Sequence, residues 1–384
     1  MVKAVVVGGA SGIGLALTKS LIEKGYFVFI FDKHEPSNQK MLPEAAYQFC
    51  QCDLLEQQYQ DLRRLSEDPE VDTLLITAGF GRVCSFDELS LTEIDHLMRV
   101  NALAGIQILK IFYDRISSPT PFYTAMMGSI AGLVSSPLFS VYAASKAALC
   151  RMVESVNIEL EMLGTPNRIL NVSPGSIKGT AFNGGATDLL QLGALSEEIL
   201  KNMMQRQALF IPDYDTTFQR VISEYQTSAH DFGVNSYEYK MKSGRKTEKR
   251  SDIVGYLSGT FDLFHVGHLN LLRRARSQCD YLIVGVHQDA SHKGKQTFIP
   301  FEERKEIVGA VKYVDQVVDS CPEDSDAWDL WHYDKLFVGS DYKGTERFNR
   351  YEQELGKKGV EIVYFPYTKG TSSTQIRETI MNKK

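Results

Sequence analysis

Short apolar runs alternate with longer segments of helical periodicity over the first two-thirds of the chain. The longer segments place apolar residues three or four positions apart, as on the buried face of a helix. The short runs are almost continuously apolar, which is typical of strands covered on both faces of a parallel sheet. This repetition predicts a doubly wound α/β domain with helices on both faces of its sheet. The expected strands include residues 3–7, 26–31, 71–78 and 168–173, and the clearest helical segments are residues 13–25 and 91–112.

The alternation stops near residue 226 and resumes after residue 252. The sequence between is polar and mostly aperiodic, and residues 240–250 hold six basic residues against one glutamate. A solvated linker is the favoured interpretation, and a basic patch for a phosphate ligand is the alternative. We therefore expect two α/β domains, residues 1–235 and 251–384, joined by a basic polar linker at 236–250. Five strands are expected in the smaller second domain, at residues 253–257, 280–286, 313–318, 335–340 and 360–365.

Composition narrows the class of protein. The chain of 384 residues is 43% hydrophobic and 23% charged, as in ordinary globular enzymes. Its net charge of −6 gives no reason to expect nucleic acid as a partner. No apolar run approaches the roughly 20 residues of a membrane-spanning helix. Cys50 and Cys52 form a single CxC without a second pair, so they are read as ordinary thiols. These features favour a cytoplasmic protein with small-molecule substrates.

A glycine-rich segment, GGASGIG, lies between the first expected strand and the first helix. Glycine allows the sharp turn and the close approach of a diphosphate to the N–H groups of a helix N-terminus. A purely structural turn is the alternative. Asp32 ends the second strand, where a carboxylate would bind the adenosine ribose and repel a 2'-phosphate, so NAD is favoured over NADP. Lys33 could offset that repulsion. The residues expected to bind the dinucleotide here are Gly8, Ser11, Gly12, Ile13, Gly14 and Asp32.

Tyr142 and Lys146 are four residues apart in YAASK, so they share one face of a helix. A lysine cation beside a phenol stabilises the phenolate and is expected to lower the pKa of the tyrosine. Such a tyrosine can donate and accept a proton during catalysis. Taken alone, the pair could equally be surface chemistry.

Four further motifs accompany this pair: GSIAG, TAG, VNALAG and PGSIKGT. Along the chain they occur in the order TAG, VNALAG, GSIAG, YAASK and PGSIKGT. In that order they resemble the short-chain dehydrogenase/reductase family over roughly residues 1–225, which implies a Rossmann-type fold and an NAD(P) cofactor. The resemblance implies that Ser129 orients the carbonyl, Tyr142 exchanges the proton, Lys146 binds the ribose, and Asn101 supports a proton-relay water. Thr77 stands where the family usually has asparagine, and the family's last strand is hard to locate. The resemblance adds Asp53, Ala78, Gly79, Ile177 and Thr180 to the cofactor-binding residues.

The sequence GTFDLFHVGH, residues 259–268, follows the first strand of the second domain and precedes a helix. His265 and His268 could form a metal site or could be core or capping histidines. However, the peptide dipoles at a helix N-terminus favour an anion, and Gly267 lets a phosphate approach the backbone. Two histidines there can donate hydrogen bonds to nucleotide phosphates, and no protein metal site is expected.

This segment, with KGTSSTQIR near the C-terminus, resembles the nucleotidyltransferases that include glycerol-3-phosphate, choline-phosphate and ethanolamine-phosphate cytidylyltransferases. The likeness covers about residues 252–380 and implies a Rossmann-like nucleotidyltransferase domain with CTP as substrate and Mg²⁺ on its triphosphate. Tyr367 and Lys312 stand where the glycerol-phosphate enzymes usually have arginine. The catalytic residues implied are His265, His268, Lys295 and Arg377. The nucleotide-binding residues implied are these four with Gly259, Thr260, Phe261, Gly267, Lys293, Asp315, Asp341, Ser372, Ser373 and Thr374.

A reductase and a cytidylyltransferase on one chain suggest consecutive steps. We expect a ketose phosphate, with ribulose 5-phosphate favoured, to be reduced to a polyol phosphate and converted to a CDP-polyol for a capsule or teichoic acid. CDP-glycerol remains nearly as plausible as CDP-ribitol. The reductase could instead act on a CDP-linked ketone, or be a silent NAD-binding module. Lys178 or Arg206 could hold a substrate phosphate or be plain surface charges. Both families imply a homodimer or tetramer.

Overall fold

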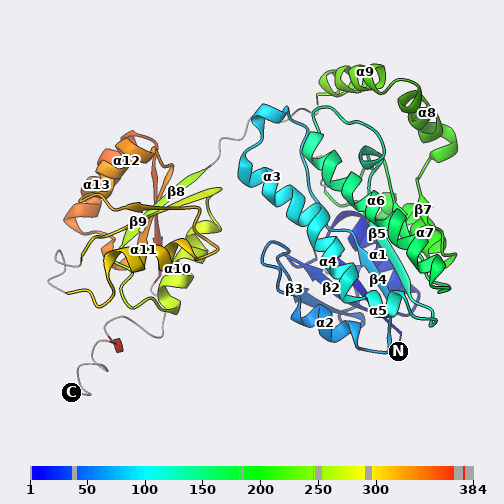
Figure 1. Cartoon of the computed structure of the whole chain (residues 1–384), viewed down its shortest axis with the longest axis horizontal. Helices are drawn as coiled ribbons and strands as arrows, with labels where there is room; N and C mark the ends of the chain where they lie inside the picture. The colour runs from blue at the N-terminus through cyan, green and yellow to red at the C-terminus, as the bar shows by residue number, and fades with distance from the viewer. Residues whose placement is uncertain are drawn as a thin grey trace. The chain divides into compact units, whose positions relative to one another are not determined.

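The computed structural model describes residues 2–36, 41–180, 182, 186–244, 246, 253–289, 296–366 and 375–376. The chain divides into two compact units, residues 1–249 and 250–384. Each unit has its own parallel β-sheet covered by helices (Figure 1). The α/β architecture predicted from the alternating pattern is therefore confirmed for both units.

The first unit contains a seven-stranded sheet in the order β3-β2-β1-β4-β5-β6-β7. All neighbouring strands run parallel. The order reverses between β1 and β4, and in such sheets ligands bind beyond the carboxyl ends of the strands at that point. The strands are β1 (Lys3–Val7), β2 (Phe27–Asp32), β3 (Tyr47–Gln51), β4 (Val71–Ile76), β5 (Tyr123–Met127), β6 (Ile169–Val172) and β7 (Leu209–Phe210).

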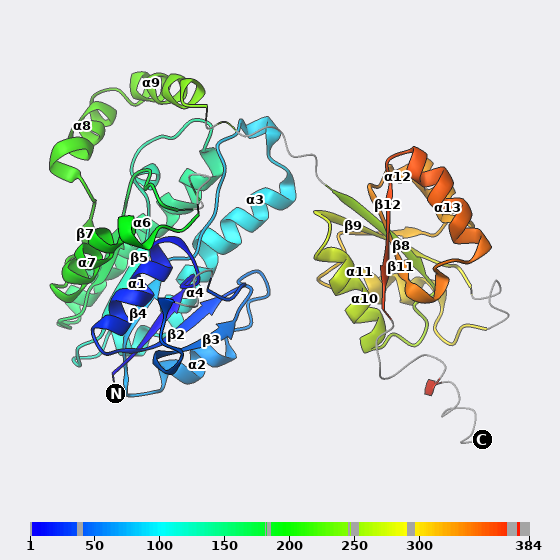
Figure 2. The same cartoon turned by 180° about the vertical axis from the view of Figure 1, so that it is seen from behind.

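Helices cover both faces of this sheet because the strand side chains alternate between them. Val5 and Val7 of β1 belong to one core cluster with residues of α2, α4 and α6. Ala4 and Val6 belong to a second cluster with α1 and α7, on the face turned to the viewer in Figure 2. The helices of this unit are α1 (Gly12–Glu23), α2 (Gln60–Ser66), α3 (Leu91–Met98), α4 (Ala104–Ile111), α5 (Tyr113–Ile116), α6 (Ser140–Met162), α7 (Leu189–Met204), α8 (Gln219–Thr227) and α9 (Ala229–Lys242).

Residues 91–112, expected to be helical throughout, are interrupted. A π-helical turn, Arg99–Leu103, separates α3 from α4. Such turns insert one extra residue into the helix and often occur at functional sites. Asn101 lies in this turn, with its side chain buried.

The expected linker at residues 236–250 is helical in its first half, because α9 extends to Lys242. Ser228 begins α9 by accepting a hydrogen bond from the backbone N–H of Asp231, and α9 lies outside the two helical layers (Figure 1). Beyond it, Val83 forms an isolated parallel bridge with Lys246. Low apolar content concealed this helix from a periodicity argument. The family's last strand is β7, a short strand upstream of this region, and the segment FGVNSYEYKM is helical.

The second unit contains a five-stranded parallel sheet in the order β10-β9-β8-β11-β12. Its strands are β8 (Val254–Gly259), β9 (Tyr281–Val286), β10 (Gln316–Asp319), β11 (Lys335–Gly339) and β12 (Glu361–Phe365), as the apolar runs predicted. One core cluster packs α10 and α11 on the sheet and another packs α12 and α13 on its other face. These helices are α10 (Val266–Arg276), α11 (Phe301–Gly309), α12 (Asp324–Trp331) and α13 (Glu346–Lys357).

Cys50 and Cys52 are free thiols at the end of β3. Burial raises the pKa of both, that of Cys52 to about 11, which agrees with ordinary structural thiols. Within the ranges the structure describes, no helix combines the length and the apolar character needed to cross a bilayer.

Candidate active sites

The glycine-rich turn of the first unit joins β1 to α1 by a close backbone contact. Gly8 has a positive φ of 84°, and a Cβ atom there would lie 2.5 Å from the backbone nitrogen of Ala78. A Cβ atom on Gly14 would lie 2.0 Å from the carbonyl oxygen of Gly8. Thr77, which replaces the family's asparagine, donates a hydrogen bond to the Val7 or Gly8 carbonyl oxygen at 3.0 Å and closes the same turn. Only glycine fits these positions.

At the N-terminus of α1, one backbone N–H group is hydrogen-bonded to a threonine hydroxyl from the segment before α7. The backbone N–H of Gly12 donates to Thr187 Oγ1 at 2.9 Å. Thr180 lies beside Gly12 and donates to the carbonyl oxygen of Ile177. The structure therefore brings the expected residues after β6 to the start of α1. Thr187 had no sequence signal, because it lies outside the recognised motifs.

Asp32 ends β2 and holds the glycine-rich turn. Its carboxylate accepts hydrogen bonds from the backbone N–H of Ala10 at 3.0 Å and of Lys33 at 2.7 Å. Lys33 Nζ in turn forms an ion pair with Asp53 Oδ2 at 3.2 Å. Two carboxylates and one ammonium group thus lie where the adenosine end of a dinucleotide is expected.

Ser129, Tyr142, Lys146 and Asn101 come together from three elements. Ser129 follows β5, while Tyr142 and Lys146 lie in α6. Lys146 Nζ donates to the carbonyl oxygen of Met127 at 2.8 Å and lies 5.8 Å from the Tyr142 ring centroid. Asn101 Nδ2 donates to the carbonyl oxygen of Phe80 at 2.7 Å. The set that the sequence predicted forms one constellation at the carboxyl edge of the sheet.

The ionisation of Tyr142 differs from the expectation. Burial raises the pKa of Tyr142 to about 12, and a hydrogen bond with Ser129 acts in the opposite direction. The rings of Phe139 and Phe182 lie 4.4 and 5.2 Å from its ring and remove water from it. Burial also lowers the pKa of Lys146 to about 8, because a buried ammonium loses hydration. The expected lowering of the tyrosine pKa is thus reversed, since desolvation outweighs the lysine.

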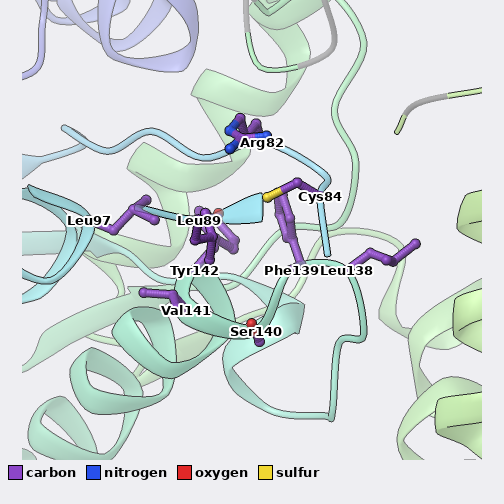
Figure 3. Close-up of a pocket in the computed structure, with 9 residues that line it drawn as sticks. All are labelled: Arg82, Cys84, Leu89, Leu97, Leu138, Phe139, Ser140, Val141 and Tyr142. Carbon is purple, nitrogen blue, oxygen red and sulfur yellow. The ribbon is translucent and has the colours of Figure 1, made fainter. Parts of the chain in front are cut away.

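A small pocket adjoins Tyr142 (Figure 3). The guanidinium of Arg82 lies at its edge and pairs with Glu93 through bonds of 2.7 and 2.9 Å. Most of the other lining side chains are apolar. The remaining lining residues are Cys84, Leu89, Leu97, Leu138, Phe139, Ser140 and Val141.

Arg206 does not belong to this site. Its guanidinium donates to Asn167 Oδ1 at 2.6 Å and to the carbonyl oxygen of Pro166 at 3.1 Å. Pro166 and Asn167 precede β6, so Arg206 lies at the amino edge of the parallel sheet, opposite the edge that carries Tyr142. Lys178 follows β6 at the carboxyl edge and is exposed.

In the second unit, the loop after β8 is held in an unusual backbone conformation. Phe261 and Leu263 both have φ of 51°, in the left-handed region that non-glycine residues rarely adopt. The buried carboxylate of Asp262 fixes the loop by accepting hydrogen bonds from the backbone N–H groups of Phe298 and Ile299. Such strain persists only where surrounding bonds enforce it, and it is common at functional sites.

Arg304 of α11 is completely buried, and its side chain supports this loop through hydrogen bonds. Its guanidinium donates to four carbonyl oxygens, those of Thr260, His287, Gln288 and Ile299. It therefore joins the carboxyl ends of β8 and β9 to the segment before α11. Arg304 received no role in the sequence analysis, because spacing cannot distinguish a buried arginine from a surface one.

The two histidines stack on each other at the start of α10, with ring centroids 4.1 Å apart. His265 is the N-cap, and its Nδ1 accepts a hydrogen bond from the backbone N–H of Gly267 at 3.0 Å. Burial lowers the pKa of His265, which favours the neutral imidazole. Since Nδ1 is the acceptor, the neutral ring carries its hydrogen on Nε2 and presents a donor there. The N-cap role and a phosphate-binding role are thus compatible.

The other expected nucleotide residues fall into three groups. Asp341 follows β11 and, like Gly259 and Thr260 at the end of β8, lies at the carboxyl edge. Asp315 lies at the opposite, amino edge of the sheet, because it precedes β10. Its carboxylate accepts a hydrogen bond from the backbone N–H of Leu282 at 2.8 Å and forms an ion pair with Arg276 at 3.1 Å. The assignment of Asp315 to the nucleotide is therefore wrong. Outside the described residues lie Lys293, Lys295, Ser372, Ser373, Thr374 and Arg377.

Comparison with known proteins identifies both halves. Residues 2–189 match the family model for short chain dehydrogenases, and residues 256–379 match the cytidylyltransferase-like model. Glycerol-3-phosphate cytidylyltransferase of Staphylococcus aureus is 33% identical over 129 residues, which are 33% of this chain and 92% of that protein. The Bacillus subtilis enzyme of the same name is 36% identical over 126 residues, which are 32% of this chain and 92% of that protein. A solved short-chain dehydrogenase from Sphingobium yanoikuyae in complex with NADPH covers 66% of this chain and 99% of its own, at 17% identity and a TM-score of 0.49.

Proposed function

Because the chain carries a short chain dehydrogenase domain and a domain of the cytidylyltransferase-like family, we propose that it makes a CDP-activated polyol in two steps. The first step reduces a ketose phosphate to a polyol phosphate. The second transfers a cytidylyl group from CTP to that phosphate and releases pyrophosphate. The observation that carries this proposal is the presence, on one chain, of a tyrosine–lysine–serine constellation and a paired-histidine loop, since reduction creates a polyol that the transferase can activate.

In the reductase site, the nicotinamide supplies the hydride when it is bound. The hydroxyl of Ser129 binds the carbonyl oxygen and Tyr142 donates its phenolic proton to that oxygen as it becomes an alcohol. Lys146 stabilises the resulting phenolate by its positive charge. The glycines at positions 8 and 14 are required by the tight turn between β1 and α1, because a Cβ atom at either would meet the chain's own backbone. A turn of this kind is where the diphosphate of a dinucleotide binds in Rossmann-type folds.

In the transferase site, an oxygen of the acceptor phosphate attacks the α-phosphorus of CTP, and the bond to the leaving pyrophosphate breaks. His265 Nε2–H donates to the phosphates, and His268 stacks beside it as a second donor. These groups act by positioning and by stabilising charge, as is usual in phosphoryl chemistry. The residues proposed to bind the triphosphate are Lys293, Lys295, Ser372, Ser373, Thr374 and Arg377. A Mg²⁺ ion, when bound with CTP, would add positive charge that stabilises the leaving pyrophosphate.

For the substrate, we favour ribulose 5-phosphate, reduced to ribitol 5-phosphate and converted to CDP-ribitol for a capsule or teichoic acid. A three-carbon route to CDP-glycerol is the second candidate, and it is favoured by the name of the bacterial relatives. Against it, Lys312 and Tyr367 stand where arginines are expected in glycerol-phosphate enzymes. We also propose that the protein is cytoplasmic and that it forms a homodimer or a homotetramer.

The deciding experiment measures pyrophosphate release from CTP with polyol phosphates, and with ketose phosphates in the presence or absence of NADH or NADPH. We expect a ketose phosphate to release pyrophosphate only when a reduced nicotinamide is present. If polyol phosphates react but no ketose phosphate oxidises the nicotinamide, the consecutive-step proposal is wrong. The reductase would then act on a CDP-linked ketone, or serve only as an NAD-binding module.

Cofactor choice provides the first prediction, made for Asp32→Asn. Asparagine keeps an acceptor for the Ala10 N–H but removes the negative charge that repels a 2'-phosphate. We expect kcat/KM for NADPH relative to NADH to rise roughly ten- to a hundredfold, since juxtaposed like charges cost several kcal/mol. Asp61→Asn, an exposed residue of α2, is the control. An unchanged cofactor ratio in Asp32→Asn would remove Asp32 from the cofactor site.

The pH dependence of reduction provides the second prediction. Tyr142, with a pKa of about 12, stays protonated over the working range, whereas Lys146, with a pKa of about 8, loses its charge above pH 8. We therefore expect kcat for reduction to fall above pH 8, by about tenfold per pH unit. In Lys146→Arg the charge persists to much higher pH, so its residual rate should lack this decline. A wild-type profile that is flat to pH 10 would contradict this assignment.

A further inference from the structure

Two loops form the pocket beside Tyr142, and one hydrogen bond joins them. The first loop supplies Cys84 to the lining, and the second supplies Leu138 and Phe139 (Figure 3). The backbone N–H of Cys84 donates to the carbonyl oxygen of Leu138 at 2.8 Å. Phe139 then places its ring 4.4 Å from that of Tyr142, measured between centroids. The course of the second loop therefore determines what covers the reacting tyrosine.

The second loop contains a strained residue at this point. Leu138 has a positive φ of 62°, in the left-handed region that a leucine rarely adopts. Such a conformation persists only where surrounding contacts enforce it, and it is common at functional sites. The bond from Cys84 fixes the peptide group that follows Leu138. The peptide group that precedes Leu138 is fixed from outside the loop.

Helix α9 supplies that outer contact. Lys240 Nζ donates to the carbonyl oxygen of Pro137, in the peptide group directly before Leu138, at 2.8 Å. It also donates to Ser136 Oγ at 2.7 Å. Gly233, seven residues earlier on α9, lies against the same turn, because a Cβ atom there would be 3.9 Å from Pro137 Cγ. One face of α9 thus holds the turn that contains the strained residue.

Lys246, four residues beyond the end of α9, holds the first loop. Its backbone forms the parallel bridge with Val83, and its ammonium group forms an ion pair with Glu88 Oε1 at 3.0 Å. The other carboxylate oxygen, Glu88 Oε2, accepts a hydrogen bond from the backbone N–H of Ser85 at 3.0 Å. The hydrogen bond from Lys246 lowers the pKa of Glu88 to about 2, so the pair stays charged at neutral pH. Lys246 therefore binds this loop on both sides of Cys84.

The core of the first unit forms without α9. All residues of α9 belong to the described part of the chain, none of them is buried, and none belongs to either core cluster of this unit. The match to the short chain dehydrogenase model ends at residue 189, well before α9 begins. A change in α9 is therefore expected to act on the two pocket loops and to leave the core packing as it is.

We propose that α9 and Lys246, together the α9 strap, hold the ketone-binding pocket in shape, with Lys240 and Lys246 as positioning residues for reduction. The proposal rests on the proposed reduction of a ketone and adds to it a segment outside the dehydrogenase motifs. Neither lysine touches the substrate or the nicotinamide. Lys240 acts through the turn that carries Phe139, and Lys246 acts through the loop that carries Cys84.

The test is steady-state reduction by full-length Lys240→Met, Lys246→Met and the double variant, with ribulose 5-phosphate, dihydroxyacetone phosphate and the two unphosphorylated ketoses as substrates. In the double variant we expect kcat/KM for the ketone to fall roughly ten- to a hundredfold, because a misplacement of about 1 Å at a reacting centre has an effect of that size. The dissociation constant of NADH, the thermal midpoint and pyrophosphate release from CTP should keep their wild-type values, because the glycine-rich turn, the core and the transferase are built from other segments.

Three further variants test the route of this effect. Lys240→Arg keeps a cationic donor and should recover part of the kcat/KM that Lys240→Met loses. Glu88→Gln removes the charge that pairs with Lys246, so its effect should not add to that of Lys246→Met. Lys242→Met is the matched control, since Lys242 is an exposed lysine of α9 paired with Glu238, and it should reduce the ketone as the wild type does.

An unchanged kcat/KM in the double variant would overturn the inference while leaving the proposed function intact. A fall accompanied by a comparable loss of NADH affinity, or by a lowered thermal midpoint, would also overturn it, since the lysines would then support the fold in general. If the wild type reduces only unphosphorylated ketoses, the ketose-phosphate proposal fails, and the same variants decide the inference with those substrates. A wild type that reduces none of the four ketoses overturns both.

Discussion

Replacing Tyr142 by phenylalanine is expected to abolish ketone reduction and to leave cytidylyl transfer unchanged. The change removes one oxygen atom, which is the proton donor, and keeps the ring that packs against Phe139 and Phe182. General acid catalysis contributes about 10²–10⁴-fold, so kcat should fall by at least a hundredfold. The measurement is nicotinamide oxidation with the ketose phosphate, alongside pyrophosphate release from CTP and the polyol phosphate.

Tyr225→Phe is a suitable control, because Tyr225 lies in α8 and packs edge-to-face on Phe232. It should reduce the ketone at the wild-type rate. Retention of more than a tenth of the wild-type kcat in Tyr142→Phe would mean that another group donates the proton. Loss of both activities in a folded protein would mean that the two sites are not independent.

Replacing His268 by alanine is expected to impair cytidylyl transfer and to leave ketone reduction unchanged. The imidazole stacks on His265 at 4.1 Å and contacts the rings of Phe261 and Phe264, so its loss removes both a donor and a support for the loop. Loss of one preorganised donor typically lowers kcat by about 10²–10³-fold. Pyrophosphate release should fall by that factor, while nicotinamide oxidation continues at the wild-type rate.

A second variant separates the two roles of this side chain. His268→Asn retains a small donor, so it should be less impaired than His268→Ala if hydrogen bonding to phosphate dominates. His332→Asn, in the left-handed position at the end of α12, is the control and should transfer the cytidylyl group normally. Equal activity of wild type and His268→Ala would exclude His268 from the transferase site.

The sequence predicted the parts of the fold that depend on buried apolar runs. All five strands of the second unit and the strands β1, β2, β4 and β6 coincide with such runs. The strand β7 has only two residues, Leu209 and Phe210, too few for a periodic pattern. Helix α9 was missed for the opposite reason, since none of its residues is buried and its apolar content is low. Both features depend on tertiary contacts that periodicity does not encode.

The candidate sites were predictable where residues follow strands of known order. Ser129, Tyr142, Lys146 and Asn101 converge because each lies at the carboxyl edge of the first sheet or on a helix packed there. Asp315 was misassigned because an aspartate before a strand and one after a strand are similar in sequence but lie at opposite edges. The pKa of Tyr142 was misjudged because its burial depends on tertiary packing, to which Phe182 contributes from a segment distant in sequence. The roles of Lys295, Arg377 and the C-terminal serines stay predictions.

The four carbonyl oxygens bound by Arg304 limit how the transferase could evolve. A guanidinium is a rigid planar donor, and its partners belong to segments at residues 260, 287–288 and 299. Insertion of a residue in any of these segments would misplace a carbonyl and leave a buried N–H group without an acceptor. The lengths of these loops should therefore vary little among descendants of this chain. New acceptor specificities would have to arise from segments that Arg304 does not bind, such as the turn at residues 340–345 after β11.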